Sequence, residues 1–100
     1  MTASAEAKVT VTNEVGLHAR PAVKLAKLAK SFPARVEMAL SAEGPWVDAK
    51  SVVKVMAARV PKGAVLHLRA AGEDASQAVE ALVDLVERNF DEGEAHARTA

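Results

Sequence analysis

The sequence predicts a single domain of the α+β class, in which three helices cover one face of a four-stranded, mostly antiparallel sheet. Apolar and polar residues alternate over 7–12, 36–41 and 64–70, which is the period of a strand with one covered face. Over 19–31 and 75–90, apolar residues instead recur every three or four positions, as on an amphipathic helix. One further short strand and one short helix complete the order strand, helix, strand, strand, helix, strand, helix. This order favours two layers around one core.

The first strand is predicted over 7–12 and the first helix over 19–31. Gly16 interrupts the strand pattern, and Pro21 marks a helix start, because a proline in the first turn loses no needed hydrogen bond and has a helical φ. Pro33 prevents the helix from continuing. The helix has a basic outer side, and its apolar stripe consists of Ala22, Leu25, Ala29 and Phe32.

A hairpin followed by a short helix is predicted in the middle of the chain. The outgoing strand covers 35–41 and the return strand 46–49, with a turn at 42–45 that contains glycine and proline. Ser51 is of a type preferred at a helix N-cap, and the helix after it is expected to end near Arg59. The apolar set of the outgoing strand consists of Val36, Met38 and Leu40.

The last strand and the last helix complete the domain. The strand is predicted over 64–70, and Asp74 with Gln77 three residues later forms a capping-box pattern at the start of the helix. The broad apolar stripe of this helix consists of Ala75, Ala78, Val79, Leu82, Leu85, Val86 and Phe90. Residues 1–90 are therefore expected to form the domain, and 91–100 a disordered charged tail.

Composition and charge argue against several classes of function. Lysine plus arginine and aspartate plus glutamate both number 13, and only three residues are aromatic, so no nucleic-acid partner is expected. There is no cysteine, no long apolar run and no signal-peptide pattern, which favours a cytoplasmic protein without a membrane partner. Neither a glycine-rich nucleotide loop nor metal-type spacing occurs, so we expect no cofactor and no metal. A monomer is expected.

Residues 16–22, Gly-Leu-His-Ala-Arg-Pro-Ala, place His18 and Arg20 where the first strand gives way to the first helix. Helix starts leave backbone N–H groups without partners and carry a partial positive charge, so they bind anions. The same charge disfavours the protonated imidazole, so a neutral ring nitrogen can attack without a general base. The planar guanidinium of Arg20 fits phosphate oxygens. The segment therefore predicts a reversible phosphohistidine at His18.

The backbone and loop around His18 are expected to cradle the phosphoryl group. The residues concerned are Gly16, Leu17, Ala19 and Pro21. Gly16 allows a sharp turn from strand to helix, Leu17 anchors the loop by burial, and Pro21 fixes the helix start. Structural alternatives remain open, because His18 could bond a backbone group and Arg20 could be a solvated surface charge.

This segment resembles the active-site loop of the HPr family, the histidine-containing phosphocarriers of the bacterial phosphotransferase system. The likeness runs over about 9–90. Residues 48–56 resemble the family's second helix with its leading serine, 60–64 the turn before its last strand, and 71–86 the entry to its last helix. The resemblance implies an open-faced β-sandwich and a phosphoryl group carried on Nδ1 of His18.

The resemblance also implies a role as a stoichiometric carrier in the phosphoenolpyruvate-dependent sugar phosphotransferase system, without turnover of its own. His18 would accept a phosphoryl group from phosphorylated Enzyme I and pass it to an EIIA-type acceptor, while Arg20 steadies the group. Partners are expected to dock on basic and apolar residues beside the histidine. These residues are Lys24, Lys27, Val52, Val53 and Met56.

Regulation and partner choice leave alternatives open. In some members of the family a kinase phosphorylates the serine matching Ser51, so HPr kinase/phosphorylase or a transcriptional regulator is a possible partner. The chain could instead be a regulatory binding module switched at Ser51, or a carrier for a nitrogen-control or dihydroxyacetone branch. Val15 replaces a polar residue common in the family, and the hairpin at 41–46 is longer than is typical; both features bear on partner choice.

Overall fold

The computed structural model describes residues 3–12 and 19–91 of the chain. Along the sequence its elements are β1 (Ser4–Thr10), α1 (Ala19–Lys30), β2 (Arg35–Ala39), β3 (Val47–Asp48), α2 (Val52–Ala57), β4 (Val65–Ala71), α3 (Ala75–Glu87) and a short 3-10 helix, η1 (Asn89–Asp91). The predicted order of strands and α-helices is confirmed. The 3-10 helix at the end was not predicted. No helix in the described ranges is long and apolar enough to cross a membrane.

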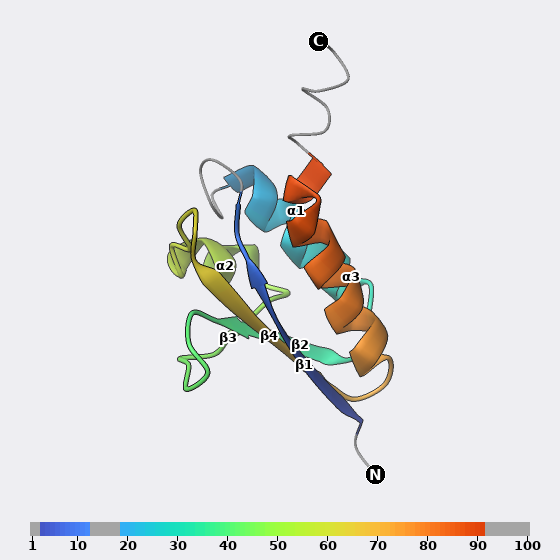
Figure 1. The fold of residues 1–100 in the computed structure, drawn as a ribbon. Coiled ribbons are helices and arrows are strands. Elements are labelled where there is room, and N and C mark those ends of the chain that lie inside the picture. The colour runs from blue at the N-terminus through green and yellow to red at the C-terminus, as the bar shows by residue number, and fades with distance from the viewer. Residues whose placement is uncertain (1–2, 13–18, 92–100) are drawn as a thin grey trace.

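The four strands form one sheet in the order β1-β4-β2-β3, and every neighbouring pair is antiparallel. β1 therefore lies at one edge and pairs with β4 along its whole length. Figure 1 shows α1 and α3 side by side over one face of the sheet, with α2 next to α1 on the side away from α3. The predicted α+β class, an open-faced sandwich of three helices on a four-stranded sheet, is confirmed.

The core lies between this face of the sheet and the helices. Leu66 and Leu68 of β4 point inward from the central strand, and both are fully buried. They belong to the same apolar cluster as Leu25 of α1 and Leu82 of α3, which are also fully buried. Burial of side chains of this size stabilises a fold by about 1.5–3 kcal/mol each, so the stripes predicted from periodicity hold the layers together.

The predicted apolar set of β2 is wrong at its last member. Val36 and Met38 are fully buried, but the strand ends at Ala39, and the side chain of Leu40 is 45% exposed. Beyond it the chain enters a turn in which the N–H of Gly44 donates to the carbonyl of Ser41 at 3.0 Å. Because the strand ends before Leu40, the alternation of side chains between the two faces of the sheet does not extend to this residue.

One predicted helix boundary and one predicted cap are also corrected. α2 ends at Ala57 rather than near Arg59, because Arg59 has a φ of 53° in the left-handed region, which continues no right-handed helix. The capping box at Asp74 is wrong, since this N-cap residue has φ 65° and ψ 25° and its side chain makes no capping hydrogen bond. A capping box requires an extended N-cap, whose side chain then reaches the third amide of the helix.

The end of α3 differs from the prediction as well. The helix ends at Glu87, and Phe90, expected on its apolar stripe, lies in η1 with a φ of 56°. The ring is nevertheless fully buried in the core cluster. The apolar stripe thus predicted the burial of Phe90 but not the break in the backbone that allows it. The expected boundary between domain and tail at 90 and 91 stays a prediction, since residues 92–100 lie outside the described residues.

Candidate functional site

The segment with the predicted nucleophile lies between two described elements. Val15, Gly16, Leu17 and His18 are outside the described residues, so their predicted roles stay predictions. The structure describes both flanks of this segment, Thr12 after β1 and Ala19 at the start of α1.

The β1 flank is held by hydrogen bonds to two different parts of the chain. The N–H of Val11 donates to the carbonyl of Ala64 at 2.9 Å, and the N–H of Gly63 donates to the carbonyl of Val11 at 2.6 Å. The hydroxyl of Thr12 then donates to Oδ1 of Asn89 in η1 at 2.6 Å. Val11 itself is fully buried. These contacts fix the point at which the chain leaves the sheet.

The α1 flank begins with exposed residues and is anchored by buried ones. Ala19 and Arg20 are exposed, whereas Pro21 and Ala22 in the same turn are fully buried. The described first turn of this 12-residue helix holds no acidic residue, so its partial positive charge is not offset there. Pro21 thus lies in the first turn, as predicted, and directs Arg20 outward beside the helix start.

A bond from the second turn of α1 ties this flank to η1. Nζ of Lys24 donates to the backbone carbonyl of Phe90 at 2.7 Å, and the Lys24 side chain is half-buried. Because Asn89 bonds Thr12 and its neighbour Phe90 bonds Lys24, η1 braces both flanks of the site. Sequence reasoning missed this brace. The burial of Phe90 was visible in the apolar pattern, but nothing local pointed to its carbonyl.

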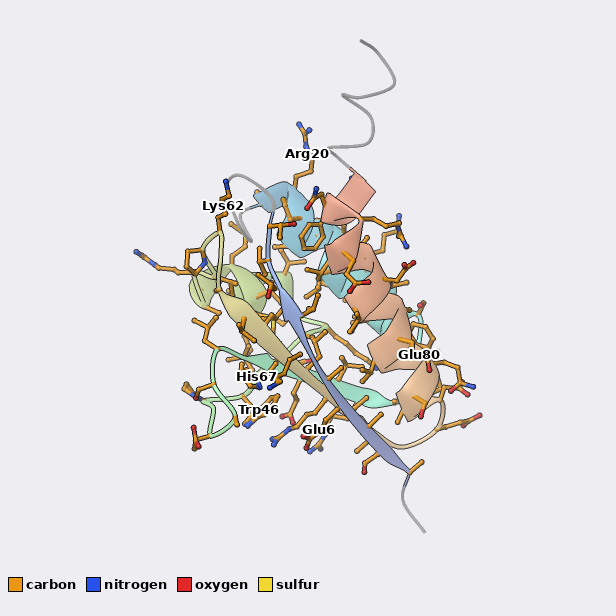
Figure 2. The ribbon with its side chains drawn as sticks, viewed as in Figure 1. Glu6, Arg20, Trp46, Lys62, His67 and Glu80 are labelled. Atoms are coloured by element: carbon orange, nitrogen blue, oxygen red, sulfur yellow. The ribbon has the colours of Figure 1, made fainter. Side chains whose placement is uncertain are left out.

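A second cation lies at the same end of the molecule as Arg20. Figure 2 shows Arg20 and Lys62 both at the end where β1 stops and α1 starts. Lys62 belongs to the turn before β4, which Gly63 links to Val11. Both side chains are exposed. Together with the helix start they make this end favourable for an anion. The sequence indicated the turn but not the placement of its lysine.

Ser51 caps α2, as predicted. It has an extended backbone with φ −103° and ψ 112°, and its hydroxyl accepts a hydrogen bond from the N–H of Lys54 at 3.3 Å. The preceding Lys50 donates from Nζ to the carbonyl of Phe32, beyond the end of α1, at 2.8 Å. α2 is therefore fixed at its start both by its own cap and by a link to the α1 region.

The apolar residues of α2 divide into one anchor and an outward set. Val55 is fully buried against the core, Val52 is half-buried, and Val53 and Met56 are 76% and 41% exposed. We call Val52, Val53 and Met56 the α2 patch. The expectation that some of these apolar side chains are exposed is confirmed, while their use in docking stays a prediction. On α1, Lys27 is exposed and Lys24 is half-buried.

No metal cluster marks this end of the described structure. Within residues 3–12 and 19–91, no three histidine or acidic side chains gather in a way that could hold a metal ion. A cavity of about 650 Å³ lies between the hairpin and α2, bordered by residues such as Leu40, Trp46 and Ala57. No α1 residue lines this cavity, so we place no phosphoryl chemistry there.

The sequence of the whole domain is similar to proteins of one family. The family model described as "PTS HPr component phosphorylation site" matches residues 5–88. The phosphocarrier protein HPr of Pseudomonas aeruginosa is 41% identical over 87 residues, which cover 87% of this chain and 96% of that protein. The multiphosphoryl transfer protein of Haemophilus influenzae is 45% identical over 74 residues, which make up only 15% of that longer protein.

Solved structures agree with these sequence relatives. The HPr-C-His structure from Thermoanaerobacter tengcongensis superposes with a TM-score of 0.81 at 36% identity, covering 88% of this chain and 97% of the other. HPr from Bacillus anthracis gives a TM-score of 0.74 at 32% identity, with 82% and 95% covered. Fold, sequence and phosphorylation-site model point the same way. The chain therefore belongs to the HPr family of phosphocarriers of the phosphotransferase system.

Proposed function

We propose that this chain carries phosphoryl groups on His18, accepting them from phosphorylated Enzyme I and delivering them to an EIIA-type acceptor of sugar transport. The observation that carries the proposal is the match of the phosphorylation-site family model to residues 5–88, which include the segment with His18. In the sequence, His18 directly precedes Ala19, the first residue of α1. A helix start is a favourable place for a phosphoryl group.

The proposed transfer exchanges one phosphorus–nitrogen bond for another. The lone pair of Nδ1 of His18 attacks the phosphorus atom held by the histidine of Enzyme I, and the bond to that histidine breaks as the new one forms. The acceptor repeats the attack on the phosphorylated His18. Arg20 would balance the negative charge of the group during both steps, since its guanidinium always stays charged. The carrier ends each cycle unchanged and performs no turnover alone.

Partner docking is proposed on the side of the molecule next to this start of α1. The positive charges of Lys24 and Lys27 would speed encounters with acidic surfaces, and the exposed Val53 and Met56 would provide apolar contact. The half-buried Val52 would border the same contact. Such a mixed surface favours fast association with moderate affinity, which a carrier that must release each partner requires.

Regulation at Ser51 is proposed as a property of the same surface. A phosphate on this serine would stand at the start of α2, one residue before the α2 patch. Added negative charge would oppose the approach of an acidic partner. The kinase or transcriptional regulator that this implies, the sugar served and a cytoplasmic location are further parts of the proposal.

Incubation with Enzyme I and labelled phosphoenolpyruvate tests the proposal. We expect an acid-labile, base-stable label on the wild-type chain and none on His18→Ala. The matched control is His67→Ala, which removes a half-buried histidine of β4 and should keep the label. A wild-type chain that takes no label would reject the carrier role in favour of a binding module. A label that survives in His18→Ala would move the site to another residue.

A further inference from the structure

The edge of β1 away from β4 presents backbone groups that no other strand of the described residues uses. At the two ends of the strand, Ala3 accepts from the N–H of Gly72 and Val11 donates to Ala64, so odd-numbered residues bond toward β4. In an antiparallel ladder the backbone N–H and C=O groups of the residues in between point away from the partner strand. The N–H and C=O groups of Ser4, Glu6, Lys8 and Thr10 are therefore directed to the free edge of the sheet.

A groove follows this edge, between β1 and α3. It consists of a hollow of about 420 Å³ between β1 and α3 and an adjoining one of about 570 Å³. The second shares Glu87 of α3 with the first and otherwise follows β1 from Lys8 to Thr12, beside Val65 of β4. The floor of the first hollow is apolar and includes Ala5, Ala7 and Val83. We call this feature the β1–α3 groove. It shares no residue with the start of α1 or with the α2 patch.

Acidic side chains line the first hollow of the groove. They are Glu80, Asp84 and Glu87, and all three come from α3. Figure 2 shows Glu80 on the α3 side of β1 and Glu6 on the opposite side. Asp84 pairs with Arg88 one helical turn later. Within the described residues no ion pair involves Glu80 or Glu87, although the whole chain has no net charge.

We propose that the β1–α3 groove binds an extended segment of a partner protein that carries lysine or arginine at every second position. Such a segment can add to the free edge of β1 as a further strand, using the outward backbone groups. Its alternate side chains would then face α3, where the apolar stems cover Ala7 and Val83 and the charged ends reach the carboxylates. The exposed Lys8 favours an acidic or polar residue on the other face of the added strand.

A second copy of this chain fits the groove less well than a basic segment does. Pairing of two β1 edges about a two-fold axis would bring the α3 carboxylates of both copies together. Glu80 and Asp84 would then face the same residues of the other copy, which is repulsive. The acidic wall therefore selects against self-association and for a basic partner.

The probe is a synthetic peptide of about nine residues in which lysine alternates with threonine, long enough to pair with all seven residues of β1. Titration into the ¹⁵N-labelled full chain should shift the amide signals of Glu6 and Lys8. A peptide with the same composition but all lysines in one block should bind about tenfold more weakly, because it cannot place them on one side of a strand. Equal affinity for the two peptides, or shifts confined to α1 and α2, would overturn the proposal.

Two pairs of variants separate strand addition from attraction of charges. Glu80→Lys should weaken binding of the alternating peptide about tenfold, whereas Glu43→Lys, the same change in the hairpin loop, should not. Lys8→Pro removes an outward N–H and should weaken binding in comparison with Lys8→Ala. Equal effects within the glutamate pair would overturn the proposal even if the proline variant fails to fold. Labelling of Glu80→Lys by Enzyme I should be unaffected, so this test and that of the carrier role fail independently.

Discussion

The ammonium group of Lys24 donates a hydrogen bond to the backbone carbonyl of Phe90, with 2.7 Å between nitrogen and oxygen. The contact joins α1 to residues that follow 66 positions later in the chain. One residue earlier, Asn89 accepts the hydroxyl of Thr12 at the end of β1. The two flanks of the segment with His18 are thus held by the same short 3-10 helix. Lys24, predicted as a docking residue, has this structural role in addition.

Replacing Lys24 with methionine tests the brace. The variant keeps the apolar stem but leaves the Phe90 carbonyl without this donor, so we expect the free energy of unfolding to fall by about 1–2 kcal/mol. Urea denaturation, monitored by circular dichroism, measures this change in the free energy of unfolding. Lys27→Met is the matched control, since Lys27 is exposed on the same helix. If both variants unfold at the same urea concentration, the Lys24 bond does not stabilise the fold.

Two substitutions of Ser51 separate its cap from its proposed regulation. Ser51→Ala removes the acceptor of the Lys54 N–H and should cost about 1 kcal/mol of stability. Ser51→Asp keeps a capping side chain, so the fold should stay stable while the added charge slows phosphoryl transfer from Enzyme I. Thermal unfolding and the rate of labelling give the two readouts. Unchanged transfer to and from every partner tested would exclude the switch, and a stable Ser51→Ala variant would exclude the cap.

Local patterns predicted the parts of this fold that local physics decides. The period of α1 and α3 placed Leu25 and Leu82 in the core, because one apolar stripe on a helix must be covered. Ser51 was predictable as a cap from its residue type alone. The left-handed backbone of Arg59 and Asp74 was not predictable, since both have positive φ without being glycine. Such a backbone is imposed by the chain packing around it, which no single-residue preference records.

Some features of the candidate site were likewise predictable from the local sequence, and others were not. The motif around His18 identifies the residues of the chemistry, and the start of α1 beside it follows from Pro21. Four apolar residues in one short helix predicted that part of α2 is exposed, but only packing shows that Val55 is the anchor. The Lys24 and Thr12 bonds join residues far apart in sequence, so no local pattern could indicate them.

Trp46 and Arg69 form a further long-range contact that can be tested by fluorescence. The Arg69 guanidinium lies 4.0 Å from the centre of the Trp46 ring, and its Nε donates to Glu37 at 2.8 Å. Arg69→Met should lower stability by about 1 kcal/mol, because both interactions are partly exposed. Trp46 is the only tryptophan, so its emission should also shift. Arg35→Met, an exposed arginine of β2, is the control. Identical emission spectra of the two variants would show that the contact with the ring is not maintained.

A charge placed on the α2 patch should slow phosphoryl transfer without lowering the stability of the fold. Met56→Lys places a charge on the proposed docking surface and should lower the kcat/KM of phosphorylation by Enzyme I about tenfold or more. Because Met56 is 41% exposed, the unfolding transition should stay in place. Val65→Lys alters a side chain of similar exposure, 43%, on β4 and should leave the rate unchanged. Equal rates for both lysine variants would remove the α2 patch from the docking surface.

Arg20→Ala tests the proposed role of the exposed guanidinium in the first turn of α1. We expect a stable fold and phosphoryl exchange slowed about a hundredfold in both directions, because a charge that stabilises the transferring group acts on the forward and the reverse step alike. Lys30→Ala removes an exposed charge from the last turn of the same helix and serves as the control. Rapid-quench measurement of transfer from Enzyme I and back to it gives the two rates. If Arg20→Ala exchanges as fast as Lys30→Ala, steadying of the phosphoryl group must come from the backbone at the helix start and not from Arg20.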